Sequence, residues 1–212
     1  MPSPRVTPFV CHHERYERWF EQHGAAYVSE LLAVRALLRL SGRGLEIGVG
    51  SARFAVPLGV EFGIDPAPEM ISYARARGVS VARAVAEKLP FGKAAFDYVL
   101  LVTTLCFVEN PAAMLAEAHR VLRPDGALVI GFIDRASALG GEYHARRADN
   151  VFYRDARFYS NDEVERLLGD AGFGGIAWVQ TLTHPLPETP EIESARTGRG
   201  QGSFVVVRAV RD

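Results

Sequence analysis

The sequence predicts a single α/β domain whose core is a doubly wound, mostly parallel sheet. Segments typical of strands and of helices alternate along most of the chain, which is the order that produces such a sheet. The stretch 45–54 passes from apolar residues through two closely spaced glycines into small residues, as expected where a strand turns tightly into a helix. Residues 96–102 are almost continuously apolar, which is typical of a parallel strand buried on both faces. With 212 residues, 48% of them apolar, the chain can bury one complete core.

The first 40 residues predict a helical cap that precedes the sheet. Residues 1–12 are rich in proline, and we expect them to be poorly ordered. From 13 to 40 the apolar residues recur at helical spacing. Gly24 divides this pattern into two helices, and the second ends at Ser41-Gly42.

The rest of the chain divides by its pattern into residues 41–133, a long polar and aromatic segment over 134–159, and a C-terminal helix with two strands over 160–212. The expected strands are 44–48, 60–64, 79–81, 96–102, 127–133, 175–182 and 203–210. The expected helices are a short one from 51 that Pro57 interrupts, then 68–75, 111–122 and 160–170. A turn over 123–126, served by Gly126, leads into the fifth strand.

Two glycines stand at the turn after the first strand. Gly48 and Gly50 allow a positive φ and let a ligand come close to the backbone. Glu46 stands at the carboxyl end of the strand, and open α/β sheets bind their ligands at that edge. A helix that starts at Ser51 would direct its free N–H groups toward the same place.

The class of ligand follows from what surrounds this turn. The dinucleotide fingerprint Gly-x-Gly-x-x-Gly needs a third glycine where this chain has Arg53. The carboxylate of Glu46 repels a pyrophosphate but attracts a cationic amine, so a nucleoside that carries an amino acid fits best. Asp65 ends the second strand, where nucleotide-binding folds place an acid that binds ribose hydroxyl groups. Capping of the next helix before Pro66 is the alternative role of Asp65, and the two roles are compatible.

This stretch resembles motif I of the class I S-adenosylmethionine-dependent methyltransferases. The loop 86–91 resembles the adenine-side loop of the family, and 120–128 resembles its helix–turn–strand unit that closes the core. Together the matching pieces cover residues 40–135 and are similar to the type 11 methyltransferases, the group that includes ubiquinone and menaquinone biosynthesis enzymes. One departure is Ala52, which replaces the third glycine of the family's motif I. The resemblance implies a Rossmann-like sheet with an antiparallel last strand and helices on both faces.

The resemblance also implies the cofactor, S-adenosyl-L-methionine, and the product, S-adenosyl-L-homocysteine. Residues 41–133 would then be the cofactor-binding half. The implied cofactor-binding residues are Glu46, Gly48, Gly50, Asp65, Pro66, Met70, Glu87, Leu89, Thr103, Thr104, Tyr16 and Trp19. In related enzymes the N-terminal helix covers the cofactor and offers a tyrosine to its carboxylate. Simple packing of that helix on the domain is the alternative role of Tyr16 and Trp19.

The segment after the fourth strand limits the kind of acceptor. Class I enzymes that methylate exocyclic amines of bases or of glutamine carry Asn/Asp-Pro-Pro-aromatic here, and this chain does not. Enzymes that methylate C5 of cytosine carry a Pro-Cys nucleophile, whereas Cys106 follows Leu105, so we expect an inert buried thiol. The net charge of −1 and the pI near 6.6 argue against a nucleic-acid partner. We therefore expect methyl transfer to a small molecule.

Residues 134–159 are expected to form a lid over that small molecule, because a connection of this length is more often functional than not. Its arginines can bind a carboxylate or phosphate and its aromatic rings can stack on a flat substrate, which favours an acidic or aromatic acceptor. Tyr143, His144 and Tyr153 are the candidate general bases if the acceptor must lose a proton. A surface flap with solvated arginines is the alternative.

We expect no metal site. His12 and His13 are adjacent, and adjacent side chains on a helix diverge by about 100°, so the two cannot easily share one ion.

No apolar run has the length of a membrane span, and the N-terminus lacks the apolar core of a signal peptide. Cys11 and Cys106 are far apart in the sequence, so a cytoplasmic protein with free thiols is expected.

Two other functions are compatible with the same pattern. One is a non-catalytic S-adenosylmethionine-binding protein, and the other is a nucleotide-dependent oxidoreductase on the same architecture. The missing third glycine argues against the oxidoreductase.

Overall fold

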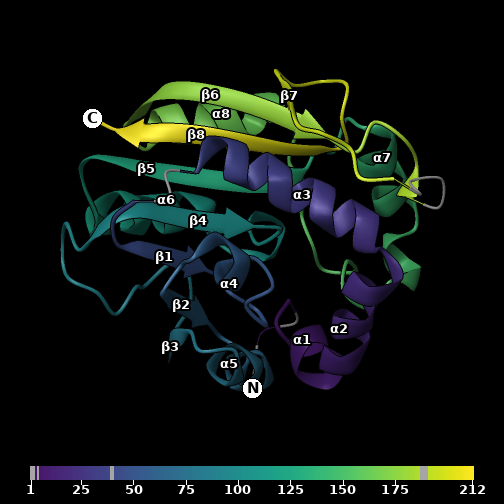
Figure 1. Ribbon diagram of the computed structural model, residues 1–212, viewed down its shortest axis with the longest axis horizontal. Coiled ribbons are helices and arrows are strands. Elements are labelled where there is room, and N and C mark those ends of the chain that lie inside the picture. The colour runs from purple at the N-terminus through teal and green to yellow at the C-terminus, as the bar shows by residue number, and fades with distance from the viewer. Residues whose placement is uncertain (1–2, 4, 39–40, 187–190) are drawn as a thin grey trace.

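A computed structural model describes residues 3, 5–38, 41–186 and 191–212. Within these ranges the chain forms one eight-stranded sheet with the order β3-β2-β1-β4-β5-β8-β6-β7 (Figure 1). The strands are β1 (Gly44–Ile47), β2 (Phe62–Asp65), β3 (Ser80–Arg83), β4 (Phe96–Val102), β5 (Leu122–Ile133), β6 (Phe173–Thr181), β7 (Arg196–Thr197) and β8 (Phe204–Arg211). The first five strands are parallel, and β8 inserts antiparallel between β5 and β6. The expected Rossmann-like sheet with an antiparallel last strand is confirmed.

The chain changes direction across the sheet at β1. From β1 it winds outward through β2 to β3, and it then crosses back to place β4 on the other side of β1. Leu45 therefore pairs with Phe62 on one side and with Val99 on the other. The carboxyl ends of β1 and β4 diverge at such a switch point, and ligands of doubly wound sheets bind there.

The helices cover both faces of the sheet (Figure 1). They are α1 (Thr7–Cys11), α2 (His13–Gln22), α3 (Gly24–Leu37), α4 (Ala55–Leu58), α5 (Pro68–Ala76), α6 (Pro111–Val121), α7 (Ala138–Ala145) and α8 (Asn161–Asp170), with short 3-10 turns η1 (Leu105–Phe107) and η2 (Arg147–Asp149). The apolar side chains of α3 and α4 pack on one face together with Leu100 of β4, and those of α6 and α8 pack on the other face with Val99 and Leu101. This alternation along β4 follows from the period of two residues in a strand. No helix in the described ranges is both long and apolar enough to cross a bilayer.

Several local expectations need correction. Part of the proline-rich segment 1–12 is helical, because Pro8 suits the first turn of α1. The segment 134–159, where the sequence predicted no helix, contains α7, which begins where the Ser137 side chain accepts a hydrogen bond from the Gly140 amide. Strand β5 begins at Leu122 rather than at 127.

The turn before the fifth strand also differs from expectation. Its left-handed residue is Asp125, with φ 61°, rather than Gly126. Gly126 is needed for space instead, since a Cβ built there would lie 2.8 Å from the carbonyl oxygen of Arg123. Residues 123–126 form an irregular part of β5 at the register shift between Phe96 and Tyr98.

Candidate active site

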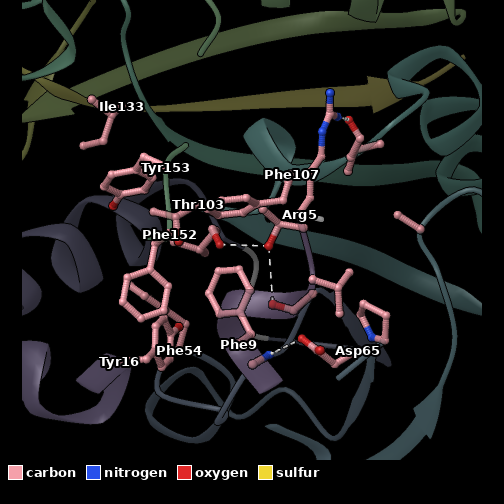
Figure 2. A pocket seen from close by; sticks show the side chains of 18 of the residues that line it. Arg5, Phe9, Tyr16, Phe54, Asp65, Thr103, Phe107, Ile133, Phe152 and Tyr153 are labelled. Carbon is pink, nitrogen blue, oxygen red and sulfur yellow. Dashed lines mark hydrogen bonds between the residues drawn. The ribbon is translucent and has the colours of Figure 1, made fainter. Parts of the chain in front are cut away.

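A cavity of about 1070 Å³ opens at the carboxyl ends of β1, β2, β4 and β5. Helices α1, α2 and α7 gather at this edge of the sheet (Figure 1). Figure 2 shows Asp65 and Tyr153 at opposite sides of the cavity, with Phe9 and Thr103 between them. The volume is slightly above the roughly 300–1,000 Å³ typical of ligand pockets, so it can hold a cofactor together with a small acceptor.

The glycine turn after β1 forms one wall of this cavity. Gly48 and Gly50 both line it and have φ of 70° and 52°, which favours glycine. A Cβ on Gly48 would overlap the side chain of Thr104, and one on Gly50 would lie 3.2 Å from the hydroxyl oxygen of Tyr16. The amides of Gly48 and Val49 donate to the carbonyl of Ile64 at 2.9 Å, which fixes the turn against β2.

The helix after the glycine turn is shorter than expected. Residues 51–54 form turns, and α4 has only the four residues from Ala55 to Leu58. The expectation that a helix starting at Ser51 would direct N–H groups toward a ligand is therefore wrong. Ala52, at the place of the family's third glycine, is buried with a left-handed φ of 64°. An alanine in this conformation costs about 1–2 kcal/mol more than a glycine.

Asp65 links the glycine turn to the end of β2. Its Oδ2 accepts a hydrogen bond from the Gly50 amide at 3.0 Å, and its Oδ1 accepts one from the Ala67 amide at 2.8 Å. The side chain lines the cavity, and burial raises the pKa of its carboxyl to about 6 despite these two bonds. Because Ala67 is the residue before α5, Asp65 does support the start of that helix. Its expected role toward a ribose stays a prediction.

Glu46 lies beside the cavity rather than in its lining. It is 2% exposed, and within the described residues its Oε2 has no hydrogen-bond partner. The pKa of Glu46 is raised well above its usual value, mainly because the carboxyl is buried. The nearby charge of Asp65 adds to this rise, and a hydrogen bond from the Ala55 amide partly offsets it. A buried carboxyl with an unused oxygen is costly unless a donor reaches it.

The N-terminal helices bring Tyr16 and Trp19 into the cavity lining. Burial, and then the charge of Glu46, raise the pKa of Tyr16, which therefore stays a neutral hydroxyl. An ion-pair network holds α2 in this position, since Glu17 Oε2 accepts from Arg53 at 2.7 Å and from Arg77 at 2.5 Å. The cap is thus attached to the glycine turn through Arg53.

The structure separates the remaining expected cofactor residues into two groups. Pro66, Glu87, Thr103 and Thr104 line the cavity. Glu87 also fixes the residues just before α6, since its Oε1 accepts hydrogen bonds from the amides of Glu109 and Asn110 at 3.0 and 3.1 Å. Met70 and Leu89 are buried and do not line the cavity. They pack in the interior because their apolar side chains sit on the inner sides of α5 and of the loop after β3.

Two of the three candidate bases line the cavity and the third does not. Tyr143 and Tyr153 line the cavity with stacked rings whose centroids are 4.7 Å apart, and burial raises the pKa of both hydroxyls. His144 is exposed and is not part of the lining. Cys106 is half-buried rather than fully buried, and desolvation still raises the pKa of its thiol to about 12, in agreement with the expected inert thiol.

The arginines of 134–159 do not line the cavity. Arg146, Arg147, Arg154 and Arg157 are all exposed at the surface. The lining arginines are instead Arg5, Arg15 and Arg83, which come from other parts of the chain.

Sequence reasoning missed Glu30 of α3. This residue lines the cavity, is only 4% exposed, and has a pKa raised to about 8 by burial. A signal for it exists in the sequence: Glu30 is four residues from Ala26 and from Val34, both buried, so it lies on the buried stripe of its helix. A charged residue on such a stripe is unusual unless it has a function.

Comparison with known proteins identifies this architecture. Residues 45–130 match the profile of a methyltransferase domain family, type 11. The chain is 46% identical to an S-adenosylmethionine-dependent methyltransferase from Thermotoga maritima, described as a possible histamine N-methyltransferase. That crystal structure matches with a TM-score of 0.96 over 98% of this chain and 100% of the other.

Two further relatives match over most of the chain. An uncharacterized protein of Methanocaldococcus jannaschii is 41% identical over 96% of this chain and 98% of its own. One of Mycobacterium tuberculosis is 43% identical over 92% of this chain and 70% of its own. The chain therefore belongs to the S-adenosylmethionine-dependent methyltransferases of type 11, with S-adenosylmethionine as the cofactor.

Proposed function

We propose that this chain transfers a methyl group from S-adenosylmethionine to a small molecule that binds in the same cavity. The proposal rests on one observation: a single continuous cavity is lined both by the glycine turn with Asp65 and by an aromatic region around Tyr143 and Tyr153. Two ligands in one cavity can lie in direct contact, and methyl transfer requires such contact.

The residues at the glycine turn fit the cofactor. Gly48 and Gly50 leave room for a nucleoside amino acid against the backbone, and Asp65 offers carboxylate oxygens to hydroxyl donors. The unused oxygen of Glu46 suits a nearby ammonium group, directly or through water. When bound, S-adenosylmethionine supplies an electrophilic methyl group and leaves as S-adenosylhomocysteine.

The aromatic region fits an acceptor with an apolar or aromatic body. Tyr143 and Tyr153 keep their protons because burial raises their pKa, so they serve as stacking surfaces and hydrogen-bond groups rather than as bases. The exposed arginines of 134–159 offer no support for an acidic acceptor, whereas the aromatic lining supports an aromatic one. The description of the Thermotoga maritima relative as a possible histamine N-methyltransferase agrees with a small, flat acceptor.

The test is an incubation of the protein with methyl-labelled S-adenosylmethionine and a cell extract that has been separated by size. We expect S-adenosylhomocysteine to form and the label to appear in a molecule of the low-mass fraction. Label only in protein or nucleic acid, or no product at all, would contradict the proposal. The second of these results, with the cofactor still bound, would favour a non-catalytic cofactor-binding protein.

A further inference from the structure

Glu30 is a buried carboxyl that faces the cavity without a partner. It lies in the middle of α3, is 4% exposed and lines the cavity. Within the described part of the chain, no hydrogen-bond donor and no ion-pair partner reaches its carboxyl group. The other buried acid in the lining, Asp65, differs because it accepts two backbone hydrogen bonds. Burial without a partner is costly, so the fold itself does not explain why an acid stands here.

The side chains that interact electrostatically with Glu30 include four tyrosines. Its charge acts on the hydroxyls of Tyr16 of α2, Tyr27 of α3, Tyr143 of α7 and Tyr153 after η2, and in each case it works to raise their pKa. His23, between α2 and α3, also lines the cavity. Another acid contacts α3 next to Glu30: the backbone amide of Glu193 donates to the hydroxyl of Ser29, while the side chain of Glu193 contacts Thr183 and His184.

A carboxylate surrounded by aromatic rings is a favourable site for a cationic amine. The carboxylate makes charge-assisted hydrogen bonds to an ammonium group, and aromatic faces attract the same cation. An alcohol or a carboxylate in this place would gain less or be repelled. We propose that Glu30 recognises the methyl acceptor, that the acceptor is a small amine, and that Glu30 takes the proton which the amine must lose. This inference rests on the proposed function and names the substrate class for that site.

The proton balance of the reaction agrees with this role. An amine bound as an ammonium ion gives one proton to the Glu30 carboxylate, which becomes neutral and frees the lone pair of the nitrogen. The nitrogen then bonds to the methyl carbon while the carbon–sulfur bond breaks and its electrons stay on sulfur. The pKa of about 8 in the free protein suits a group that accepts and later releases a proton near neutral pH.

The test measures binding rather than turnover. The wild type, saturated with S-adenosylhomocysteine, is titrated by calorimetry with 2-phenylethylamine, tryptamine and histamine, and with the matched alcohol 2-phenylethanol and acid phenylacetate. We expect at least one amine to bind about tenfold or more tightly than the alcohol and the acid. Glu30→Gln should lose this preference and leave the affinity for S-adenosylhomocysteine unchanged. Glu21→Gln, which changes an exposed acid of α2, is the control and should behave as the wild type.

A second readout separates recognition from a structural role. At pH 7 the free Glu30 is mostly protonated, so binding of an ammonium ion should release about one proton from the wild type and none from Glu30→Gln. Buffers with different heats of ionisation report this number. The variant should also unfold no earlier than the wild type. Because the folded pKa lies above the unfolded one, the wild type loses stability as the pH rises from about 5 to 8, so the difference should grow in favour of Glu30→Gln.

Several results would overturn the inference while the proposed function stands. These are equal amine affinity in wild type and Glu30→Gln, equal affinity for amine and alcohol, or no binding of any amine by a protein that binds S-adenosylhomocysteine. Failure of the proposed function would look different, since the labelled methyl group would then reach no small molecule at all.

Discussion

The backbone amide of Gly50 donates a hydrogen bond to Oδ2 of Asp65 at 3.0 Å, and this bond joins the ends of two neighbouring strands. Gly50 follows β1 and Asp65 ends β2, so the bond ties the glycine turn to the end of the neighbouring strand. A residue expected to bind a ribose therefore also shapes the turn on which the rest of the cofactor would lie.

Replacement of Asp65 by alanine should weaken cofactor binding. A hydrogen bond to a charged group contributes about 1.5–3 kcal/mol, which corresponds to roughly ten- to a hundredfold in the dissociation constant. The variant should also unfold at a lower temperature, because the amides of Gly50 and Ala67 lose their acceptor. Calorimetry with S-adenosylhomocysteine and thermal unfolding measure the two effects. Unchanged affinity in a folded Asp65→Ala protein would mean that Asp65 only supports the start of α5.

The affinity for the cofactor should rise with pH between 5 and 7. Burial raises the pKa of Asp65 to about 6, so the carboxyl is mostly neutral at pH 5 and mostly ionised at pH 7. If hydroxyl donors of the cofactor prefer the ionised form, the affinity should increase by about tenfold over this range. Asp65→Asn removes the titrating group and should flatten the profile. A wild-type profile as flat as that of the variant would contradict the assigned role.

Gly48→Ala should abolish cofactor binding, because the new methyl group overlaps Thr104 in a turn that lines the cavity. Gly59→Ala is a matched control. Gly59 has the same φ of 70° as Gly48, but no atom lies within 4 Å of the position of its Cβ. Both variants should lose stability by about 1–2 kcal/mol from the left-handed conformation alone. Only Gly48→Ala should lose S-adenosylhomocysteine binding in calorimetry. Equal binding by the two variants would mean that the glycine turn is not part of the cofactor-binding site.

Tyr143→Ala should lower methyl transfer and spare cofactor binding. Its ring stacks on Tyr153 on the side of the cavity formed by α7, away from the glycine turn. Tyr143→Phe keeps the stacking surface and should retain most of the activity, because the buried hydroxyl does not serve as a base. Single-turnover measurements with a labelled methyl group compare the two variants. A loss as large in Tyr143→Phe as in Tyr143→Ala would show that the hydroxyl itself is required.

The order of the strands and the position of the glycine turn could be predicted from the sequence, because both depend on local patterns. Apolar runs mark the buried strands, and Gly48, Gly50 and Asp65 follow those runs directly. The sequence does not predict α7, because Gly140 and Gly141 lower its helix propensity; in the structure the Ser137 side chain caps its first turn. Whether the arginine side chains of 134–159 point into the cavity or toward solvent depends on how the segment packs on the domain, and no local sequence pattern predicts that packing.

Glu30 shows a different gap between sequence and structure. Its neighbours in α3 belong to no motif, and the role that we propose for it depends on its charge interactions with tyrosines of α2, α7 and the loop after η2. Met70 and Leu89 match the family's motifs, but their side chains are buried outside the cavity lining, and their expected contact with the cofactor stays a prediction. Tertiary neighbours, rather than position in a motif, decide which side chains reach the cavity.

The central claim is that the cavity between Gly48, Gly50 and Asp65 holds a sulfonium nucleoside and not a dinucleotide. Calorimetric titration of the wild-type chain with S-adenosylmethionine, S-adenosylhomocysteine and NADH tests it most directly, with Gly48→Ala measured in parallel. We expect saturable binding of both sulfur compounds to the wild type, loss of that binding in Gly48→Ala, and no heat from NADH. Binding of NADH without heat from either sulfur compound, or full binding of S-adenosylhomocysteine by Gly48→Ala, would contradict it.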